Sequence, residues 1–150
     1  MKTTLNIPKK NNAGSGQKAH NDNRYYKAGR IRMGSWITQK LPAADILISE
    51  RELVHITNRH SNELHDLGMT SKSYIEMIVH QVNEIRRDSE AYLFIVAGER
   101  TSNKDTEQCA VVELKIEWMN RKKVYIIKSA RPMTWGRLKK IELVCVKPRS

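Results

Sequence analysis

The chain has few of the features that mark zinc-binding, redox-active or membrane-spanning proteins. Its two cysteines, Cys109 and Cys145, lie far apart and outside any C-x-x-C pair, which excludes the usual zinc and redox patterns. The N-terminus lacks the apolar segment of a signal peptide, and no run approaches the roughly twenty apolar residues of a membrane span. We therefore expect a soluble protein with no metal or other cofactor, present in the cytoplasm of the cell that makes it or of a cell into which it is delivered.

Acidic residues are nearly absent from both ends of the chain. Residues 1–40 carry nine Lys and Arg against one acid, and residues 119–150 carry ten against one, whereas residues 41–118 carry eight against fourteen. If the fold brings the ends together, they form a positive surface that binds phosphates. With a net charge of +11, the first candidate ligand is RNA. The alternative is that the lysines only keep a small protein in solution.

The length of 150 residues suits one domain. Residues 1–24 are polar, rich in Gly, Asn and Lys, and have little to bury, so they are expected to form a flexible basic tail. Residues 25–150 are expected to form a single α+β domain. Its first segment, 25–48, mixes aromatic and aliphatic residues with Gly and Pro and predicts a short helical or turn-rich entry.

Two helices are predicted next. Ser49 and Glu52 fit a capping box and Gly68 a stop, which predicts a helix over about 50–66. Its apolar stripe includes an imidazole where a leucine would be expected. The stripe consists of Leu53, Ile56, His60, Leu64 and Leu67. A second start at residues 70–71 and a steady apolar face predict another helix over about 71–87.

From residue 91 the apolar period changes to that of strands. Four segments are rich in β-branched and aromatic residues: AYLFIVA, QCAVVELKIEW, KVYIIKSA and KKIELVCV. We expect them to follow one another as hairpins. The predicted fold is therefore α+β, with N-terminal helices packed on a four-stranded antiparallel sheet, one face covered by the helices and the other open to a ligand.

Several of these segments together resemble a known family. The stretches ISERELVHITNRH, ELHDLGM, SYIEMIVHQVNEI, AVVELKI and VYIIKSARP are similar to the phage-type branch of the barnase–EndoU–colicin–RelE superfamily. The similarity runs from about Gly34 to Val146. Members are small metal-independent ribonucleases that occur as terminal toxin domains of mobile-element and contact-dependent-inhibition proteins. The resemblance implies helices followed by a four-stranded antiparallel sheet, and an acidic immunity protein as partner.

Metal-independent RNA cleavage needs a base for the 2′-hydroxyl, an acid for the leaving 5′-oxygen, and donors or cations for the phosphorane. His55 and His60 match the two histidines of the resembling helix motif. Five residues apart, they would lie about 140° from one another on a regular helix, so we expect one to be catalytic and the other structural. Alternatively, His60 is a core histidine bonded to backbone, and His55 serves capping or packing.

Further candidates lie at the end of the third predicted strand and in the basic segment before the fold. Lys128 and Arg131 could stabilise the charge of the phosphorane, and Ser129 or Thr134 could donate a hydrogen bond to the phosphate. Alternatively, these residues form an ordinary basic turn. Trp135 could stack on an unpaired base or cover an apolar edge. The predicted nucleic-acid-binding residues are Arg24, Lys27, Arg30, Arg32, Trp135 and Arg137.

The sequence thus predicts a metal-independent endoribonuclease toxin that cuts RNA, such as tRNA, by attack of the 2′-hydroxyl. The first alternative is a noncatalytic basic module that binds nucleic acid. The second is a basic domain that docks an acidic protein.

Overall fold

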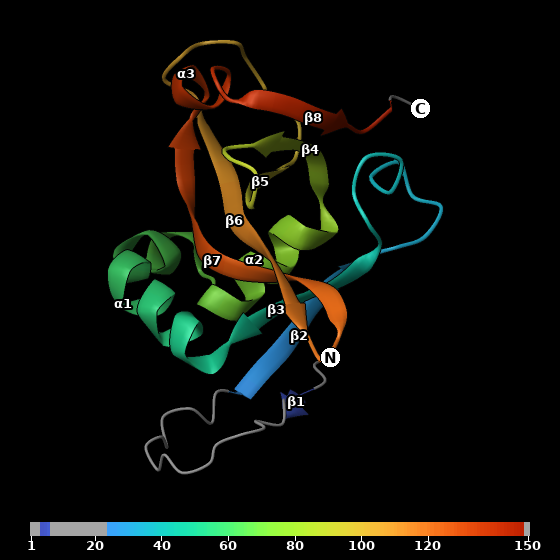
Figure 1. Cartoon of the computed structure of the whole chain (residues 1–150). Coiled ribbons are helices and arrows are strands. Elements are labelled where there is room, and N and C mark those ends of the chain that lie inside the picture. Colours follow the sequence, from blue (N-terminus) through green and yellow to red (C-terminus); the bar gives the residue numbers. More distant parts are fainter. Residues whose placement is uncertain (1–3, 7–23, 149–150) are drawn as a thin grey trace.

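The computed structural model describes residues 4–6 and 24–148 (Figure 1). Within them, strands make up most of the regular structure. The strands are β1 (Thr4–Asn6), β2 (Arg24–Ile31), β3 (Ala44–Ser49), β4 (Val82–Arg87), β5 (Tyr92–Ala97), β6 (Gln108–Met119), β7 (Lys122–Thr134) and β8 (Glu142–Val146). The helices are α1 (Glu50–Leu67), α2 (Ser71–His80) and the short α3 (Trp135–Leu138).

All the described strands join one sheet in the order β1-β2-β3-β7-β6-β5-β4-β8. The prediction of α+β class is confirmed, but the prediction of N-terminal helices on a four-stranded antiparallel sheet is wrong. Three strands precede α1, and the sheet has eight strands. It is also mixed, because β3 and β7 run parallel where Ile46 pairs with Tyr125 and Leu47 with Ile126.

The predicted hairpin succession holds only for β5, β6 and β7. β8 pairs with β4, not with β7. β4 lies in the segment predicted as the end of a long helix over 71–87. The helix ends at His80 and its C-cap is Gln81. Val82 and Ile85 continue the helical spacing of the apolar residues before them, yet they belong to a strand that pairs on both sides, which is a tertiary effect that local pattern does not reveal.

The segment 25–48 also differs from its prediction, since it contains β2 and β3 with a loop between them. The register of β2 shifts between Lys27 and Gly29, and a Cβ atom at Gly29 would overlap a side-chain carbon of Val79. Only glycine allows α2 to pack this closely on the strand. In the predicted tail, residues 4–6 form β1 on the sheet edge; its remaining residues, except Arg24 in β2, lie outside the described part of the chain.

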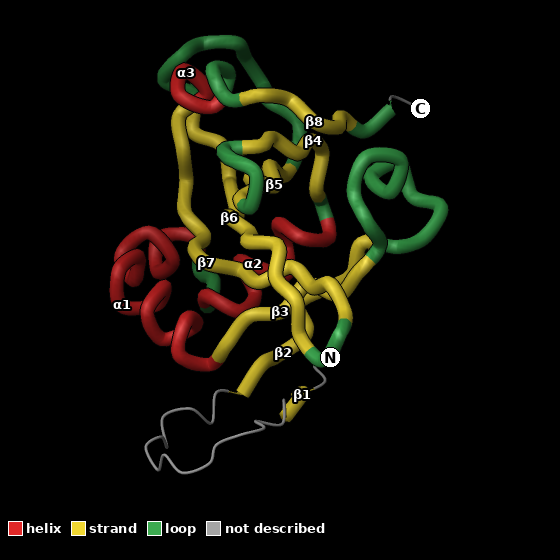
Figure 2. Tube along the Cα trace, in the orientation of Figure 1, coloured by secondary structure: helices red, strands yellow, loops and turns green. Residues whose placement is uncertain are grey.

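Helices α1 and α2 cover one face of the sheet. Figure 1 shows α2 behind β6 and β7, and α1 beside the bend of β7, while Figure 2 shows α3 near the end of β7. The main core contains Ile56 and Leu64 of α1. The adjacent residues Val111 and Val112 of β6 belong to different apolar clusters, and because neighbouring strand residues point to opposite faces, a second, smaller core lies under α3. The face expected to be open is thus partly covered.

The pKa values of two tyrosines in the main core indicate how the free energy of unfolding changes at high pH. Burial, together with the charge of Glu63, raises the pKa of Tyr74 to about 12, and burial raises the pKa of Tyr125 to about 12. Both phenols stay neutral in the folded chain at a pH where the unfolded chain ionises them, near pH 10. The stabilisation is complete below pH 10 and is lost as the pH rises through 12.

We therefore expect the free energy of unfolding to fall between pH 10 and 12, by up to about 3 kcal/mol for each tyrosine. Urea denaturation at a series of pH values from 8 to 12 measures this. Tyr74→Phe removes one of the two phenols and should show a shallower alkaline loss than the unmodified chain. An equal slope in both proteins would contradict the assignment to Tyr74.

Candidate active site

A pocket of about 310 Å³ lies between α1 and the second half of β7. It brings together four of the six residues predicted to be catalytic. Its lining residues are His55, Ile56, Arg59, His60, Ser129 and Arg131. Apart from Ile56, every one of them carries a hydrogen-bonding side chain, and two are guanidinium groups that can bind a phosphate in a bidentate manner. The pocket therefore has the composition of a site for an anionic ligand.

The α1 side of the pocket depends on a break in the helix. Ser49 caps α1 by accepting a hydrogen bond from the backbone N–H of Glu52, and Gly68 ends it in the left-handed conformation, both as predicted. Inside the helix, however, His60 has φ −125° and ψ 25°, outside the helical region. A regular helix would hold His55 and His60 about 140° apart. With the helix kinked at His60, both histidines line the same pocket, so the regular-helix geometry behind the expectation of one catalytic and one structural histidine does not apply here.

His60 is held by a carboxylate on the same helix. Its Nδ1 lies 2.6 Å from Oε1 of Glu63. Because a carboxylate only accepts, Nδ1 donates, and Nε2 is then the nitrogen that can take up a proton from a ligand. The side chain of His60 is 20% exposed and that of Glu63 is 52% exposed. His60 is thus neither a fully buried core histidine nor bonded to backbone.

His55 has a different partner. Nη1 of Arg59 lies 3.3 Å from Nε2 of His55, and since a guanidinium only donates, this contact requires a neutral imidazole. Both side chains are exposed, and both line the pocket. The contact couples the two groups, because protonation of His55 would turn Nε2 into a donor and release the guanidinium of Arg59.

The β7 side is shaped by a β-bulge. Leu114 of β6 pairs with Ile127, but the next pair joins Glu113 to Ser129, which leaves Lys128 as the extra residue. Bulges bend a strand and redirect its side chains, and Figure 1 shows β7 turning away from β3 and running up toward α3. The bulge therefore places Ser129 and Arg131 beside α1.

A chain of hydrogen bonds fixes the position of Arg131. Its Nη1 donates to Oγ of Ser129 at 3.0 Å, and that hydroxyl donates to Oε1 of Glu113 on β6 at 3.3 Å. All three residues are partly buried. Because Ser129 has its proton directed at Glu113, its oxygen is free to accept from Arg131, and the guanidinium is held in one orientation.

Two of the predicted catalytic residues do not line the pocket. Lys128 is exposed at the bulge. Thr134 is the residue before α3, and its hydroxyl makes no capping hydrogen bond. The structure thus separates the predicted turn residues into a pair that lines the pocket, Ser129 and Arg131, and a pair that does not.

The residues predicted to bind nucleic acid do not form one surface. Lys27 and Arg30 lie on β2 and both pair with Asp45, at 3.5 and 2.7 Å. Partial burial acts to raise the pKa of Asp45, but the hydrogen bond and charge of Arg30 and the charge of Lys27 hold that pKa below its usual value. These two cations are therefore engaged within the fold.

Trp135 is also engaged, since the guanidinium carbon of Arg100 lies 3.4 Å from the centre of its ring. It packs against the second core, in agreement with the alternative that it covers an apolar edge. Arg24, Arg32 and Arg137 are exposed, at the start of β2, just after β2 and on α3.

Three residues that complete the site were missed in the sequence. Arg59 follows His55 by four residues and Glu63 follows His60 by three, the spacings at which helical side chains meet; this signal was available. Glu113 joins the site only through the pairing of β6 with β7, across a bulge that no local pattern marks.

A larger pocket of about 860 Å³ lies where β4 begins and β5 and β8 end. One buried carboxylate in its lining is paired with two cations. Glu84 pairs with Arg86 and Arg100, and the nearby carboxylate of Glu107 accepts from the backbone and hydroxyl of Thr101 and Ser102, which lowers its pKa. This pocket lacks a pair of histidines and contains one arginine.

Among residues 4–6 and 24–148, no group of three or more His, Cys, Asp or Glu side chains could hold a metal ion. No helix in this part of the chain is long and apolar enough to cross a membrane. Comparison with family models, with curated proteins and with solved structures gives no match to this chain.

Proposed function

We propose that the chain is an endoribonuclease that cleaves RNA by attack of a 2′-hydroxyl on the adjacent phosphate. The observation that carries this proposal is the convergence of two histidines and two arginines in one pocket. His55, Arg59 and His60 come from α1 and Arg131 comes from β7. These are the groups that proton transfer and phosphorane stabilisation require, and elements far apart in sequence bring them together.

His60 is the proposed general base. Its Nε2 takes the proton of the 2′-hydroxyl, and the oxygen attacks phosphorus. The imidazolium that forms is stabilised by the carboxylate of Glu63 at Nδ1, as an acidic partner does for other catalytic histidines. Glu63 also fixes the tautomer, because its oxygen is within hydrogen-bond distance of Nδ1 alone.

His55 is the proposed general acid. In its protonated form it donates to the leaving 5′-oxygen as the phosphorus–oxygen bond breaks, which gives a 2′,3′-cyclic phosphate and a free 5′-hydroxyl. Protonation also ends the contact that Arg59 makes to His55, so the guanidinium becomes available to the phosphate. Arg131, held by Ser129, supplies a fixed positive charge where the phosphorane develops.

Charge supports RNA as the substrate. The formal net charge of +11 favours association with a polyanion, and a nuclease of this mechanism requires the 2′-hydroxyl that DNA lacks. A noncatalytic basic module would explain the charge, but it would not require two histidines beside two arginines in one pocket.

The test is incubation of the purified chain with RNA in excess EDTA. We expect new ends that carry 2′,3′-cyclic phosphate, because every group in the proposed mechanism belongs to the protein. Arg131→Gln should lower single-turnover cleavage by tenfold or more while RNA affinity changes far less, since the phosphorane carries more charge than the ground-state diester.

Lys140→Gln is the matched control, because Lys140 is exposed just after α3 and does not line the pocket. It removes the same charge from the chain and should leave the cleavage rate nearly unchanged. Equal losses of affinity and rate in Arg131→Gln would identify Arg131 as an ordinary phosphate-binding residue. Cleavage that stops in EDTA and returns with a divalent metal would refute the mechanism.

A further inference from the structure

The end of the β6–β7 hairpin exposes an aromatic ring. The side chain of Trp118 is 67% exposed, whereas Trp36 packs against the main core and Trp135 against the second. Trp118 pairs across the hairpin with Lys123, whose Nζ lies 5.7 Å from the centre of the indole ring. An exposed ring beside a cation is the combination that proteins use to stack a base and neutralise its phosphate.

The turn of this hairpin has a cationic residue at a position that favours glycine. Met119 pairs with Lys122, so Asn120 and Arg121 form a two-residue turn, and both have positive φ, 49° and 68°. Asn-Gly is the preferred sequence for such a turn, because a side chain is unfavourable in the left-handed region. An arginine here is locally unfavourable, and residues in unfavourable backbone conformations cluster at functional sites.

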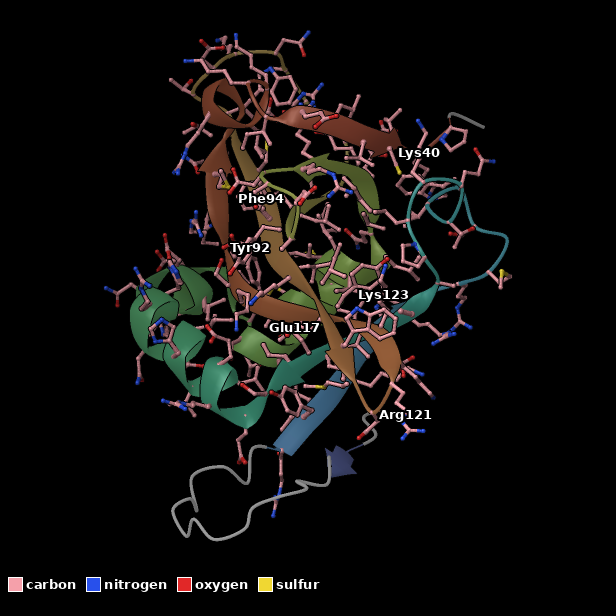
Figure 3. The ribbon with its side chains drawn as sticks, viewed as in Figure 1. Lys40, Tyr92, Phe94, Glu117, Arg121 and Lys123 are labelled. Atoms are coloured by element: carbon pink, nitrogen blue, oxygen red, sulfur yellow. The ribbon has the colours of Figure 1, made fainter. Side chains whose placement is uncertain are left out.

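Most of the charged side chains around Trp118 are cations. Three consecutive cations, Arg121, Lys122 and Lys123, are all exposed, and Figure 3 shows Arg121 at the turn and Lys123 farther along β7. The nearby acid, Glu117, pairs with Lys115 at 3.2 Å. The hairpin end (residues 118–123) is thus an exposed aromatic surface with three cations.

We propose that the hairpin end binds an unpaired segment of the RNA substrate, with one base stacked on Trp118 and the adjacent phosphates held by Arg121 and Lys123. This inference rests on the proposed function and adds a substrate class to it, RNA with a single-stranded region. Lys123 precedes Ser129 of the pocket by six residues on the same strand, roughly 20 Å of extended chain. The surface therefore contacts RNA outside the cleavage site.

Binding is measured with a ligand that cannot be cleaved, a fluorescently labelled single-stranded 2′-O-methyl RNA of about 12 nucleotides. A duplex of the same sequence is the comparison ligand. Trp118→Ala should weaken single-strand affinity by roughly 5–150-fold, the range for loss of one stacked base, with a much smaller effect on the duplex, whose bases are already stacked. Trp118→Phe should retain most of the affinity.

Arg121→Gly separates charge from folding. It removes a cation and places glycine where φ is positive, so the melting temperature should rise while affinity for the single strand falls. The slope of log affinity against log salt should lose about 0.7, the value for one phosphate contact on a single strand. Lys104→Gln is the matched control, because it neutralises an exposed lysine in the loop between β5 and β6. It should leave the single-strand affinity and the salt slope nearly unchanged.

The proposal fails if Trp118→Ala and Arg121→Gly both bind the single strand as the unmodified chain does. It also fails if these two variants lose single-strand and duplex affinity equally. Equal losses would indicate general electrostatic binding, or a surface that binds a protein partner instead. Because the methylated RNA lacks the attacking hydroxyl, these results do not depend on catalysis. Binding at the hairpin without cleavage of ordinary RNA would refute the proposed function alone, and cleavage without a hairpin effect would refute this inference alone.

Discussion

His60→Ala should cleave RNA roughly 10²–10⁴-fold more slowly than the unmodified chain, the loss expected when a general base is removed. The melting temperature should change little, because the side chain of His60 is partly exposed and its hydrogen-bond partner Glu63 is largely exposed. Single-turnover cleavage under saturating enzyme, with a thermal melt of the same preparation, measures both effects.

His65→Ala is the matched control, since His65 is an exposed histidine in the last turn of the same helix and does not line the pocket. It should leave cleavage nearly unchanged. Glu63→Gln keeps the imidazole but removes the carboxylate that stabilises the imidazolium, so it should slow cleavage by less than His60→Ala does. If His60→Ala and His65→Ala cleaved RNA equally well, His60 would not be the base.

Local signals in the sequence were sufficient for α1 and for the positions of β5, β6 and β7. A capping serine and a left-handed glycine bound α1, and these act within a few residues of the chain. The order of strands was not predictable in the same way. β4 lies between β5 and β8, and β3 joins β7 in parallel across more than seventy residues of sequence, so the sheet depends on contacts that no local pattern encodes.

In the candidate site, too, some features follow from local sequence and others depend on contacts between residues far apart in the chain. The histidines were identified individually, but the helix was assumed to be regular, and no proline or glycine in the sequence marks the break at His60. Ser129 and Arg131 were chosen as residues at the end of a strand. Their actual position depends on the bulge at Lys128, and Glu113 enters the site only because β6 pairs with β7. The residue types were therefore predictable from sequence, and their convergence was not.

The largest expected effect on stability belongs to a buried ion pair outside the pocket. Arg86 and Glu84 lie on β4, with side chains 8% and 6% exposed and 2.7 Å between Nε and Oε2. Arg86 also donates from Nη1 to the backbone oxygen of Ile141 at 2.6 Å. Nη1 of Arg100, which stacks on Trp135, approaches the same carboxylate at 3.6 Å.

Arg86→Ala should therefore lower the free energy of unfolding by about 3–5 kcal/mol, because it breaks a buried ion pair and leaves the carboxylate of Glu84 with Arg100, 3.6 Å away, as its ion-pair partner. Urea denaturation at neutral pH measures this loss. The double variant Glu84→Leu/Arg86→Met removes both charges and fills their volume with apolar groups, so it should recover most of the loss, as replacement of buried ion pairs by well-packed apolar residues often does. If Arg86→Ala cost less than about 1 kcal/mol, the value typical of exposed ion pairs, the carboxylate would have to be reached by water. If the double variant were as unstable as the single one, the cost would arise instead from the lost hydrogen bond to Ile141, which orients the chain between α3 and β8.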